Sequence, residues 1–467
     1  MNKITRFLLP LFAVLAACNA PVASQAQERL VEPTRRAPSD AAAMKSSFAP
    51  VARQAGPAVV NVYARRLVRQ RDPFFEMYGR GAPRGRVEQS LGSGVIVRAD
   101  GVIVTNNHVI AGADEIVVVM ADRREFEAKV LLADERTDVA VLRVNTAGKA
   151  LPTLAFHNSD DAEVGDIVLA IGNPFGVGQS VTQGIISALA RTRAGVSDYQ
   201  FFIQTDASIN RGNSGGALVT VSGELIGINT AIYSQSGGSV GIGFAIPANM
   251  VKTIVNTAMS GSKTIARPWL GLSTQTVTAA LADSLDLERP MGVLVNEVSP
   301  ASPAAQAGIV SGDVITKVDD FAVDDQQSLN FRTTTKGVGS TVALTYLRNG
   351  QFGTAVVRLV RAPETIARDI TVIDGRNPLH GTRVANMSPA FADEIGSDIT
   401  SGVMIIELSR VSIAARLGFL PGDIILTINE RKIASVDALQ SVLSSRPAVW
   451  NVSLKRNGQI LRLSIEG

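Results

Sequence analysis

The chain has 467 residues, which is too long for one ordinary domain, and length alone predicts about three domains. Hydrophobic residues make up 46% of the chain and charged residues 19%, a composition typical of globular proteins and not of disordered ones. The formal net charge of +3 is too small to predict nucleic-acid binding from global electrostatics. We therefore expect folded domains and no nucleic-acid partner.

The first residues have the pattern of an export signal. Lys3 and Arg6 precede an apolar run at residues 7–17 that is too short to serve as a stable membrane span. The pattern predicts a signal peptide at residues 1–26, followed by a polar tether at residues 27–45. We expect the mature chain to leave the cytoplasm.

Cys18 is the only cysteine of the chain, and two interpretations of it stay open. Residues 15–18, Leu-Ala-Ala-Cys, resemble a bacterial lipobox, in which the cysteine becomes the lipidated first residue of the mature protein. Residues 24–26, Ser-Gln-Ala, offer an ordinary small-residue cleavage site instead. The lipobox predicts a lipid-anchored protein and the cleavage site a free periplasmic one, and the sequence leaves this choice open. In either case a lone cysteine cannot form an internal disulfide.

Residues 91–247 have the pattern of an all-β domain. Apolar runs recur there at intervals of about ten residues, with turn residues between them. Asp100-Gly101, between two such runs, is a favoured hairpin signal. The runs are numerous enough for two small antiparallel barrels. After Pro247 the apolar residues change to a helical period.

The C-terminal part of the chain contains an internal repeat. Residues 292–299 align with residues 402–409, and Gly312-Asp313 aligns with Gly422-Asp423, at a constant offset of 110 residues. Two copies, each long enough for its own core, indicate tandem domains and not a solenoid. We therefore expect a β-rich domain, a first repeat, a linker and a second repeat, at residues 46–260, 266–361, 362–377 and 378–467.

A serine stands in a glycine-rich turn at residues 212–216, Gly-Asn-Ser-Gly-Gly, between two apolar runs. This turn could present a nucleophile, but its composition is also that of an ordinary hairpin turn, because Gly and Asn tolerate positive φ. Two upstream residues favour the nucleophile: His108 follows a strand, and Asp138 leads a buried apolar strand. The three side chains thus occur in the order His, Asp, Ser that two-barrel serine proteases use.

The chemistry of acyl transfer explains these residue types. Ser214 is a poor nucleophile until an imidazole accepts its proton, so His108 is the candidate general base and, later, general acid. Asp138 would fix the imidazole tautomer and stabilise the imidazolium. Asp134 is a rival carboxylate, but it lies in a turn, and we prefer Asp138. The backbone N–H groups of Gly212 and Ser214, with Asn213 as a further candidate, would form an oxyanion hole in which each donor is worth about 3 kcal/mol.

These motifs together resemble the HtrA/Deg (Do-like) family of periplasmic, trypsin-like serine endoproteases with two PDZ domains. The resemblance covers the chain from about residue 46 to its end. Its motifs are Gly92-Ser-Gly, Thr105-Asn-Asn-His108, Thr137-Asp-Val-Ala-Val-Leu142, Gly172-Asn-Pro, Gln204-Thr-Asp-Ala, Gly212-Asn-Ser-Gly-Gly216 and Gly241-Ile-Gly-Phe-Ala-Ile-Pro247.

The resemblance implies a mainly β fold, in which a two-barrel trypsin-like domain precedes two small α+β PDZ domains. It implies an uncharged specificity pocket that accepts small or medium apolar residues, a regulatory loop beginning at Arg191, and a carboxylate-binding loop in the first PDZ domain. The pocket residues would be Ile209, Ile232 and Ile242, and the loop residues Trp269, Leu270, Gly271 and Leu272. In the second repeat a polar His380 stands where the first has Leu270, so peptide binding is less expected there than a role in assembly.

The resemblance also implies the function. We expect an ATP-independent serine endoprotease of the bacterial periplasm that degrades unfolded or damaged proteins during stress, with PDZ domains that capture exposed peptide C-termini. No cofactor or metal is expected. A homotrimer is expected, with Phe48 and Tyr63 near its contacts, and larger cages are compatible with it. The alternatives are a chaperone that holds unfolded proteins without cutting them and a signalling protease with one membrane substrate.

Overall fold

The computed structural model describes residues 47–70, 84–173, 178–191, 201–210, 212–232, 239–397, 399–409, 411–445, 447–456 and 458–466. The predicted signal peptide, Cys18 and the tether lie outside these residues. Within them, no helix combines the length and the apolar character that a membrane crossing needs.

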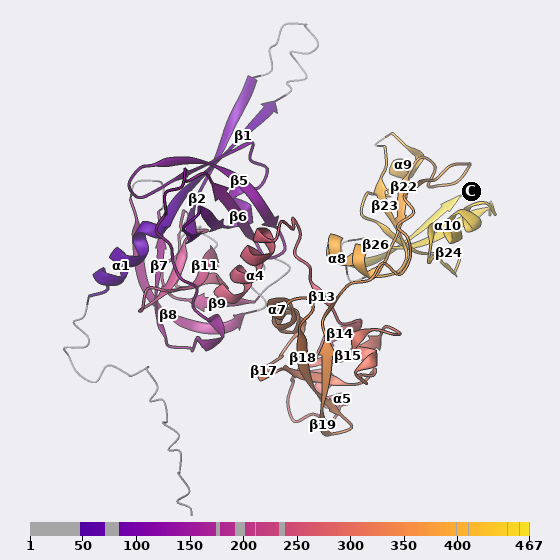
Figure 1. Cartoon of the computed structure of the whole chain (residues 1–467). Helices are drawn as coiled ribbons and strands as arrows, with labels where there is room; N and C mark the ends of the chain where they lie inside the picture. Colours follow the sequence, from indigo (N-terminus) through magenta and orange to yellow (C-terminus); the bar gives the residue numbers. More distant parts are fainter. Residues whose placement is uncertain are drawn as a thin grey trace, which may run out of the picture. The chain divides into compact units, whose positions relative to one another are not determined.

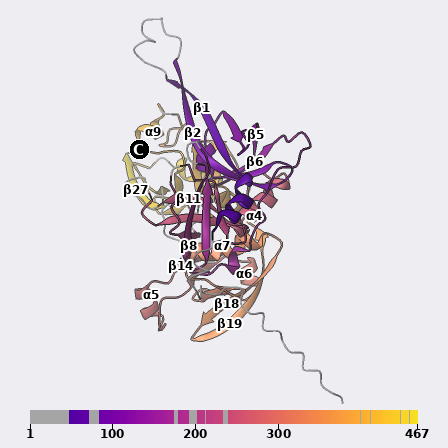
Figure 2. The same cartoon turned by 90° about the vertical axis from the view of Figure 1, so that its left-hand side faces the viewer.

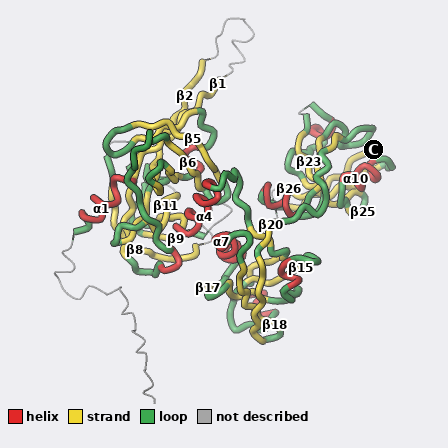
Figure 3. Tube along the Cα trace, in the orientation of Figure 1, coloured by secondary structure: helices red, strands yellow, loops and turns green. Residues whose placement is uncertain are grey.

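Two closed six-stranded barrels form the first part of the described chain, as the spacing of apolar runs predicted (Figures 1 and 3). The first barrel has the strand order β1-β2-β3-β6-β5-β4 and the second the order β10-β11-β12-β9-β8-β7. Their strands are β1 (Val59–Gln70), β2 (Arg84–Arg98), β3 (Val102–Thr105), β4 (Glu115–Val119), β5 (Glu125–Asp134), β6 (Val139–Val144), β7 (Ile167–Gly172), β8 (Ser180–Arg191), β9 (Phe202–Thr205), β10 (Ala217–Thr220), β11 (Leu225–Ile232) and β12 (Gly243–Pro247).

Short helices flank the barrels, and one longer helix follows them. They are α1 (Ala49–Ala55), η2 (Gly56–Ala58), α3 (Asn107–Ile110), η3 (Ser159–Asp161) and α4 (Ala248–Met259). The helical period predicted after Pro247 corresponds to α4, whose apolar side is buried. Strands β1 and β2 remain paired as far as Gln70 and Arg84, and Figure 2 shows this pair extending beyond the rest of the first barrel.

One apolar core joins the two barrels. It contains side chains of the first barrel such as Val104 and Val141, of the second such as Ile171 and Val219, and of α4 such as Ile254. All five are fully buried. Because the barrels share this core, elements from both can be held in fixed positions at their junction.

The first repeat is a five-stranded sheet path, β14-β15-β16-β18-β19, with β17 paired to β16 and a separate β13-β20 pair. Its elements are β13 (Pro268–Trp269), β14 (Leu272–Thr276), α5 (Ala279–Ser284), β15 (Val293–Val298), α6 (Pro303–Gln306), β16 (Val314–Val318), β17 (Phe321–Ala322), α7 (Gln326–Lys336), β18 (Thr341–Arg348), β19 (Gln351–Arg358) and β20 (Val360–Arg361).

From β22 to β27 the second repeat has the same order of elements as the first from β14 to β19, and β21 is added at the edge of its sheet path, β21-β22-β23-β24-β26-β27, with β25 paired to β24. Its elements are β21 (Thr371–Val372), β22 (Arg383–Asn386), α8 (Pro389–Ile395), β23 (Val403–Glu407), α9 (Ile413–Arg416), β24 (Ile424–Ile428), β25 (Arg431–Lys432), α10 (Val436–Leu443), β26 (Val449–Arg456) and β27 (Gln459–Glu466). Asp313 and Asp423, matched in the sequence, are both completely buried and each accepts two hydrogen bonds from an arginine guanidinium.

Candidate active site

His108 and Asp138 are in direct contact at one end of the first barrel. His108 lies in α3, directly after β3, and its Nδ1 is 2.8 Å from Oδ2 and 3.0 Å from Oδ1 of Asp138. The backbone N–H of His108 also donates to Oδ1, at 3.0 Å. Since an ionised carboxylate only accepts hydrogen bonds, Nδ1 is the donor in this contact. The histidine side chain is 50% exposed and the carboxylate 8%, so the imidazole can be reached while its partner is protected.

The backbone at Asp138 is in a rare conformation. Its φ is +57°, in the left-handed region, which costs a non-glycine residue about 1–2 kcal/mol. Its carbonyl accepts hydrogen bonds from the Asn107 N–H at 3.1 Å and from Asn106 Nδ2 at 3.0 Å. Such a conformation persists at functional sites only when neighbouring contacts impose it.

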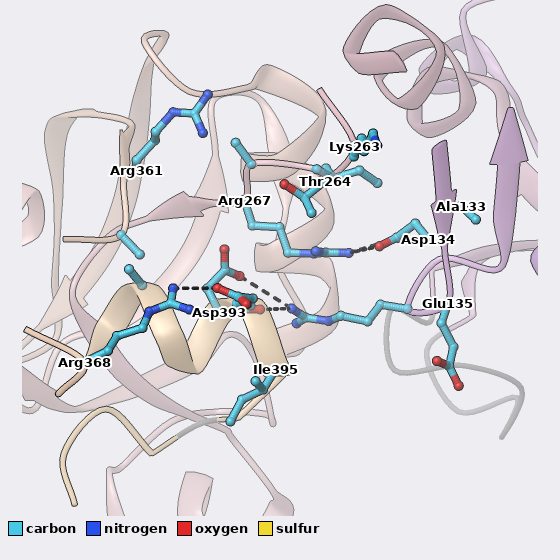
Figure 4. Close-up of a pocket in the computed structure, with 17 residues that line it drawn as sticks. Ala133, Asp134, Glu135, Lys263, Thr264, Arg267, Arg361, Arg368, Asp393 and Ile395 are labelled. Atoms are coloured by element: carbon cyan, nitrogen blue, oxygen red, sulfur yellow. Dashed lines mark hydrogen bonds and ion pairs between the residues drawn. The ribbon is translucent and has the colours of Figure 1, made fainter. Parts of the chain in front are cut away.

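Asp134, the rival carboxylate, stabilises the turn at residues 134–138 that precedes β6. Its Oδ2 accepts hydrogen bonds from the Thr137 N–H at 3.0 Å and the Thr137 hydroxyl at 2.5 Å. Both oxygens of Asp134 accept hydrogen bonds from Nη2 of Arg267, at 2.9 and 3.0 Å. Figure 4 shows the two side chains pointing toward one another. The structure therefore brings Asp138 to His108 and leaves Asp134 as part of a buried ion pair that holds the turn.

Ser214 is not bonded to His108 in this conformation. Its Oγ donates to the carbonyl of Thr230 at 3.0 Å, and within the described residues no hydrogen bond joins it to the imidazole. The hydroxyl of the same Thr230 donates to Asp138 Oδ2 at 2.6 Å. Thr230, in β11 of the second barrel, thus connects Ser214 to the carboxylate of Asp138. Sequence reasoning missed it, because a threonine inside an apolar strand has no spacing signal that relates it to Asp138.

Ser93 anchors the turn that holds Ser214. Its buried hydroxyl donates to the Gly212 carbonyl at 2.6 Å and accepts the Asn173 N–H at 2.9 Å, while its own N–H donates to the Ser214 carbonyl at 2.8 Å. A Cβ at Gly215, where φ is +84°, would lie 2.1 Å from the Ser93 carbonyl oxygen. Glycine is therefore required at residue 215 by space as well as by conformation.

The three candidate oxyanion donors differ in availability. The Asn213 N–H donates to the Asn210 carbonyl at 3.0 Å, so it is already occupied. The N–H groups of Gly212 and Ser214 donate to no backbone carbonyl in the described part of the chain. Gly212 has φ +97°, a conformation that glycine adopts without strain. Among the residues that the structure describes, Gly212 and Ser214 are thus the two candidates whose N–H groups have no backbone acceptor.

The predicted pocket residues do not share one environment. Ile209 is 1% exposed within the core of the second barrel, and a Cβ at Gly243 would lie 2.8 Å from its Cδ1. Ile242 is only partly buried and packs against the core between the barrels. Ile232 ends β11, and its side chain lies outside the described residues. The side chain of Arg191 and residues 192–200 lie outside them too, so the predicted regulatory loop is not described.

The predicted carboxylate-binding loop joins β13 to β14. Leu270 is buried in the core of the first repeat, and Gly271 has φ +76° with its Cα close to Ser302. The carbonyl of Gly271 accepts the Ser299 N–H at 2.7 Å. Trp269 and Leu272 are partly buried, and β14 lies at the edge of its sheet path. An edge strand next to such a loop is the arrangement that binds peptides by strand addition.

Comparison with known families matches this fold. A family described as trypsin-like peptidase domain matches residues 92–228, and a family described as PDZ domain matches residues 268–359. The fold and the site thus define a trypsin-like serine protease that carries a PDZ domain.

Individual relatives narrow this class. Periplasmic serine endoprotease DegP of Salmonella typhimurium is 38% identical over 400 residues, which cover 85% of this chain and 81% of that protein. Periplasmic pH-dependent serine endoprotease DegQ of Escherichia coli is 37% identical over 424 residues, covering 89% and 90%. The solved structure of the HtrA-type protease AlgW with a decapeptide has a TM-score of 0.53 at 42% identity, covering 68% of this chain and 99% of that one. The chain belongs to the HtrA/Deg family of serine endoproteases, and the names of its relatives support a periplasmic location.

Proposed function

We propose that His108, Asp138 and Ser214 are the catalytic triad of this protease. The hydrogen bonds that link His108 to Asp138, Asp138 to Thr230 and Thr230 to Ser214 carry this assignment, because they connect the two barrels at one point. The Ser214 hydroxyl transfers its proton to Nε2 of His108, and Oγ attacks the scissile carbonyl carbon. The N–H groups of Gly212 and Ser214 bind the resulting oxyanion. His108 then protonates the leaving amine, and water hydrolyses the acyl-enzyme by the same route.

The resting hydroxyl of Ser214 must turn before this reaction. A hydroxyl has one proton to donate, and here the Thr230 carbonyl accepts it. General-base catalysis therefore requires that Ser214 leaves this acceptor for His108 Nε2. Apo sites often tighten only when substrate binds, so we assign the described conformation to the resting enzyme.

The substrates that we propose are unfolded or damaged proteins, cut after small or medium apolar residues. The support is that the three residues that we assign to the pocket, Ile209, Ile232 and Ile242, are uncharged, and that strand β14 of the PDZ domain ends the described sheet path. Complexes of the related AlgW contain a decapeptide or a tripeptide, and we extend peptide capture to residues 269–272 of this chain. The domains that we propose are residues 46–260, 266–361 and 378–467, with a linker at 362–377.

A homotrimer and a choice between two N-termini complete the proposal. Sedimentation of the mature protein tests the trimer, which predicts about three chains per particle. The intact mass of the mature protein distinguishes acylated Cys18 from a start after residue 26, since the two chains differ by the nine residues 18–26 and the lipid.

The triad is tested by mixing the purified protein with a reduced and alkylated, unfolded substrate. Wild type is expected to fragment it, and Ser214→Ala and His108→Ala are expected to leave it intact. Equal fragmentation by wild type and Ser214→Ala would exclude Ser214 as the nucleophile. Aggregation suppression that survives in Ser214→Ala would show that a chaperone activity exists beside proteolysis.

A further inference from the structure

The two repeats differ at one sheet edge. In the described part of the first repeat, β14 ends the sheet path and has β15 as its single neighbour. In the second repeat β22 is the matching strand, since it follows Gly381 as β14 follows Gly271, but it lies between β23 and the additional strand β21. The edge that is open in the first repeat is therefore covered in the second.

The covering strand belongs to a segment at residues 367–373. Its backbone runs antiparallel to β22, with Thr371 opposite Val384 and Val372 opposite Arg383. Asn386 closes the far end, because its N–H donates to the Arg368 carbonyl at 2.7 Å and its Nδ2 to the Ala367 carbonyl at 2.8 Å. The segment thus follows β22 along its whole length.

The end of this segment lies at the loop that matches the carboxylate-binding loop. The Ile373 N–H donates to the Thr382 carbonyl at 2.9 Å, and the Ile373 carbonyl accepts the Gly381 N–H at 2.7 Å. Gly381 has φ +77°, against +76° at Gly271, so the two loops share this backbone conformation. A loop N–H that binds the last carbonyl of an added strand is the contact that a peptide carboxylate would make there.

The side chain of Ile373 is held as an anchor. It is 1% exposed and belongs to one core cluster with Leu379 of the loop, Val384 of β22, and Val436 and Leu439 of α10. In strand addition, the main chain of the peptide pairs with the edge strand, and pockets for its side chains give specificity. The buried side chain of Ile373 fills such a pocket. In contrast, Val372 and Ile370 are exposed. Backbone direction, loop contact and anchor therefore all correspond to a bound peptide.

We propose that the second repeat contains a peptide-binding groove whose resident ligand is residues 367–373 of its own chain. A foreign peptide that is extended and ends in a branched apolar residue binds there only after this segment leaves. The connection from Ile373 to the loop is short, so the effective concentration of the internal ligand is in the millimolar range and disfavours weak competitors. The inference rests on the proposed peptide capture, but it assigns that capture to the first repeat alone in the resting protein.

The test uses the full mature chain carrying Ser214→Ala, so that no probe is cut. The probe is a peptide of the sequence ARDITVI, taken from residues 367–373, with a free carboxylate and a photo-crosslinking group at its N-terminus. Cross-linked residues are mapped by mass spectrometry, and stoichiometry is measured by calorimetry. Two variants weaken the internal ligand: Ile373→Ala, and replacement of the mainly exposed residues 369–372 by Gly-Ser-Gly-Ser. Ile370→Ser, which changes one exposed side chain, is the matched control.

Wild type and Ile370→Ser are expected to cross-link at residues 269–276 only, and the weakened variants also at residues 379–386, with stoichiometry rising from about one to about two per chain. Cross-linking of wild type at both repeats to the same extent would overturn the internal ligand. Cross-linking of both weakened variants at residues 269–276 only, with circular dichroism that matches wild type, would also overturn the internal ligand. Binding at neither repeat in any protein would instead contradict the proposed peptide capture.

Discussion

Thr230 contributes both of its polar groups to the candidate site. Its hydroxyl donates to the buried carboxylate of Asp138, and its carbonyl accepts the hydroxyl of Ser214. The first contact helps to orient the carboxylate that holds His108. The second engages the hydroxyl that we propose as the nucleophile. One residue of β11 can therefore affect both the geometry of the base and the position of the nucleophile.

Thr230→Val should lower kcat about tenfold, because a buried carboxylate loses a donor worth about 1.5 kcal/mol. Valine has nearly the shape of threonine, so packing changes little, and Thr230→Ser keeps the hydroxyl. We expect the serine variant to retain most of the activity. The measurement is kcat and KM on a fluorogenic apolar peptide, and a valine variant as fast as wild type would contradict the role of this hydroxyl.

The ion pair of Asp134 with Arg267 should contribute strongly to stability, because both side chains are largely buried. The two side chains are 12% and 9% exposed, and removing one partner of a buried pair costs about 3–5 kcal/mol. Arg267→Gln and Asp134→Asn should each lower the free energy of unfolding of the protease domain by this order, and the double variant by less than the sum.

Urea unfolding of the four proteins measures this coupling. The control is Asp122→Asn, which breaks an exposed pair with Arg124 and should cost less than about 1 kcal/mol. Additive losses at Asp134 and Arg267 would show that the pair does not act as a unit.

The strands and repeats could be predicted from the sequence, but the pairing of strand edges and the long-range hydrogen bonds could not. Apolar spacing identified the barrels, and the constant offset of 110 residues identified the repeats. Strand β21 was not predicted, since its two residues lie in a stretch interpreted as a linker. A pattern of period two states which face of a strand is buried, but not which edge it pairs with. The sequence shows Ser93 only as part of the Gly92-Ser-Gly motif. It does not show that the Ser93 hydroxyl bonds to the Gly212 carbonyl, 119 residues away, and so joins the Ser214 turn to the first barrel.

The segment before α8 should make the second repeat sensitive to acid. The hydrogen bond from Ser388, followed by the ion pair with Arg368, lowers the pKa of Glu364 below its ordinary value of 4.5. Because the folded-state pKa is the lower one, this carboxylate stabilises the fold at neutral pH, and the contribution is lost as the pH falls through that pKa.

Glu364→Gln should therefore lower the Tm of the second repeat at pH 7, and the difference from wild type should shrink as the pH falls below the ordinary glutamate pKa and through the lower folded-state pKa. Burial raises the pKa of Asp393, so this carboxyl group changes the stability with pH in the opposite direction. Wild type and Glu364→Gln both contain Asp393, so its effect cancels in the Tm difference between them. Calorimetry from pH 7 to pH 3 provides the measurement. A Tm difference that stays constant over this range would contradict the assignment.

The proposed catalytic site depends on both barrels. His108 and Asp138 come from the first, and Ser214 and Thr230 from the second. The shared core that contains Ile171 holds them in register. We therefore expect the two barrels to lose structure and activity together.

Ile171→Ala should lower the free energy of unfolding of the protease domain by about 2–5 kcal/mol, because the side chain is fully buried. Thermal inactivation should shift with thermal unfolding. Val130→Ala, at a residue that is 46% exposed, is the control and should change either midpoint little. Inactivation that precedes unfolding by many degrees would show that the site melts independently of the core.

We propose above that Ser214, activated by His108, cuts unfolded proteins after apolar residues. Cleavage-site mapping by mass spectrometry on one unfolded protein, with wild type and Ser214→Ala side by side, tests it most directly. We expect cuts after Val, Ile, Leu or Ala with wild type and none with Ser214→Ala. Cuts that persist in Ser214→Ala, or that follow charged residues, would contradict it.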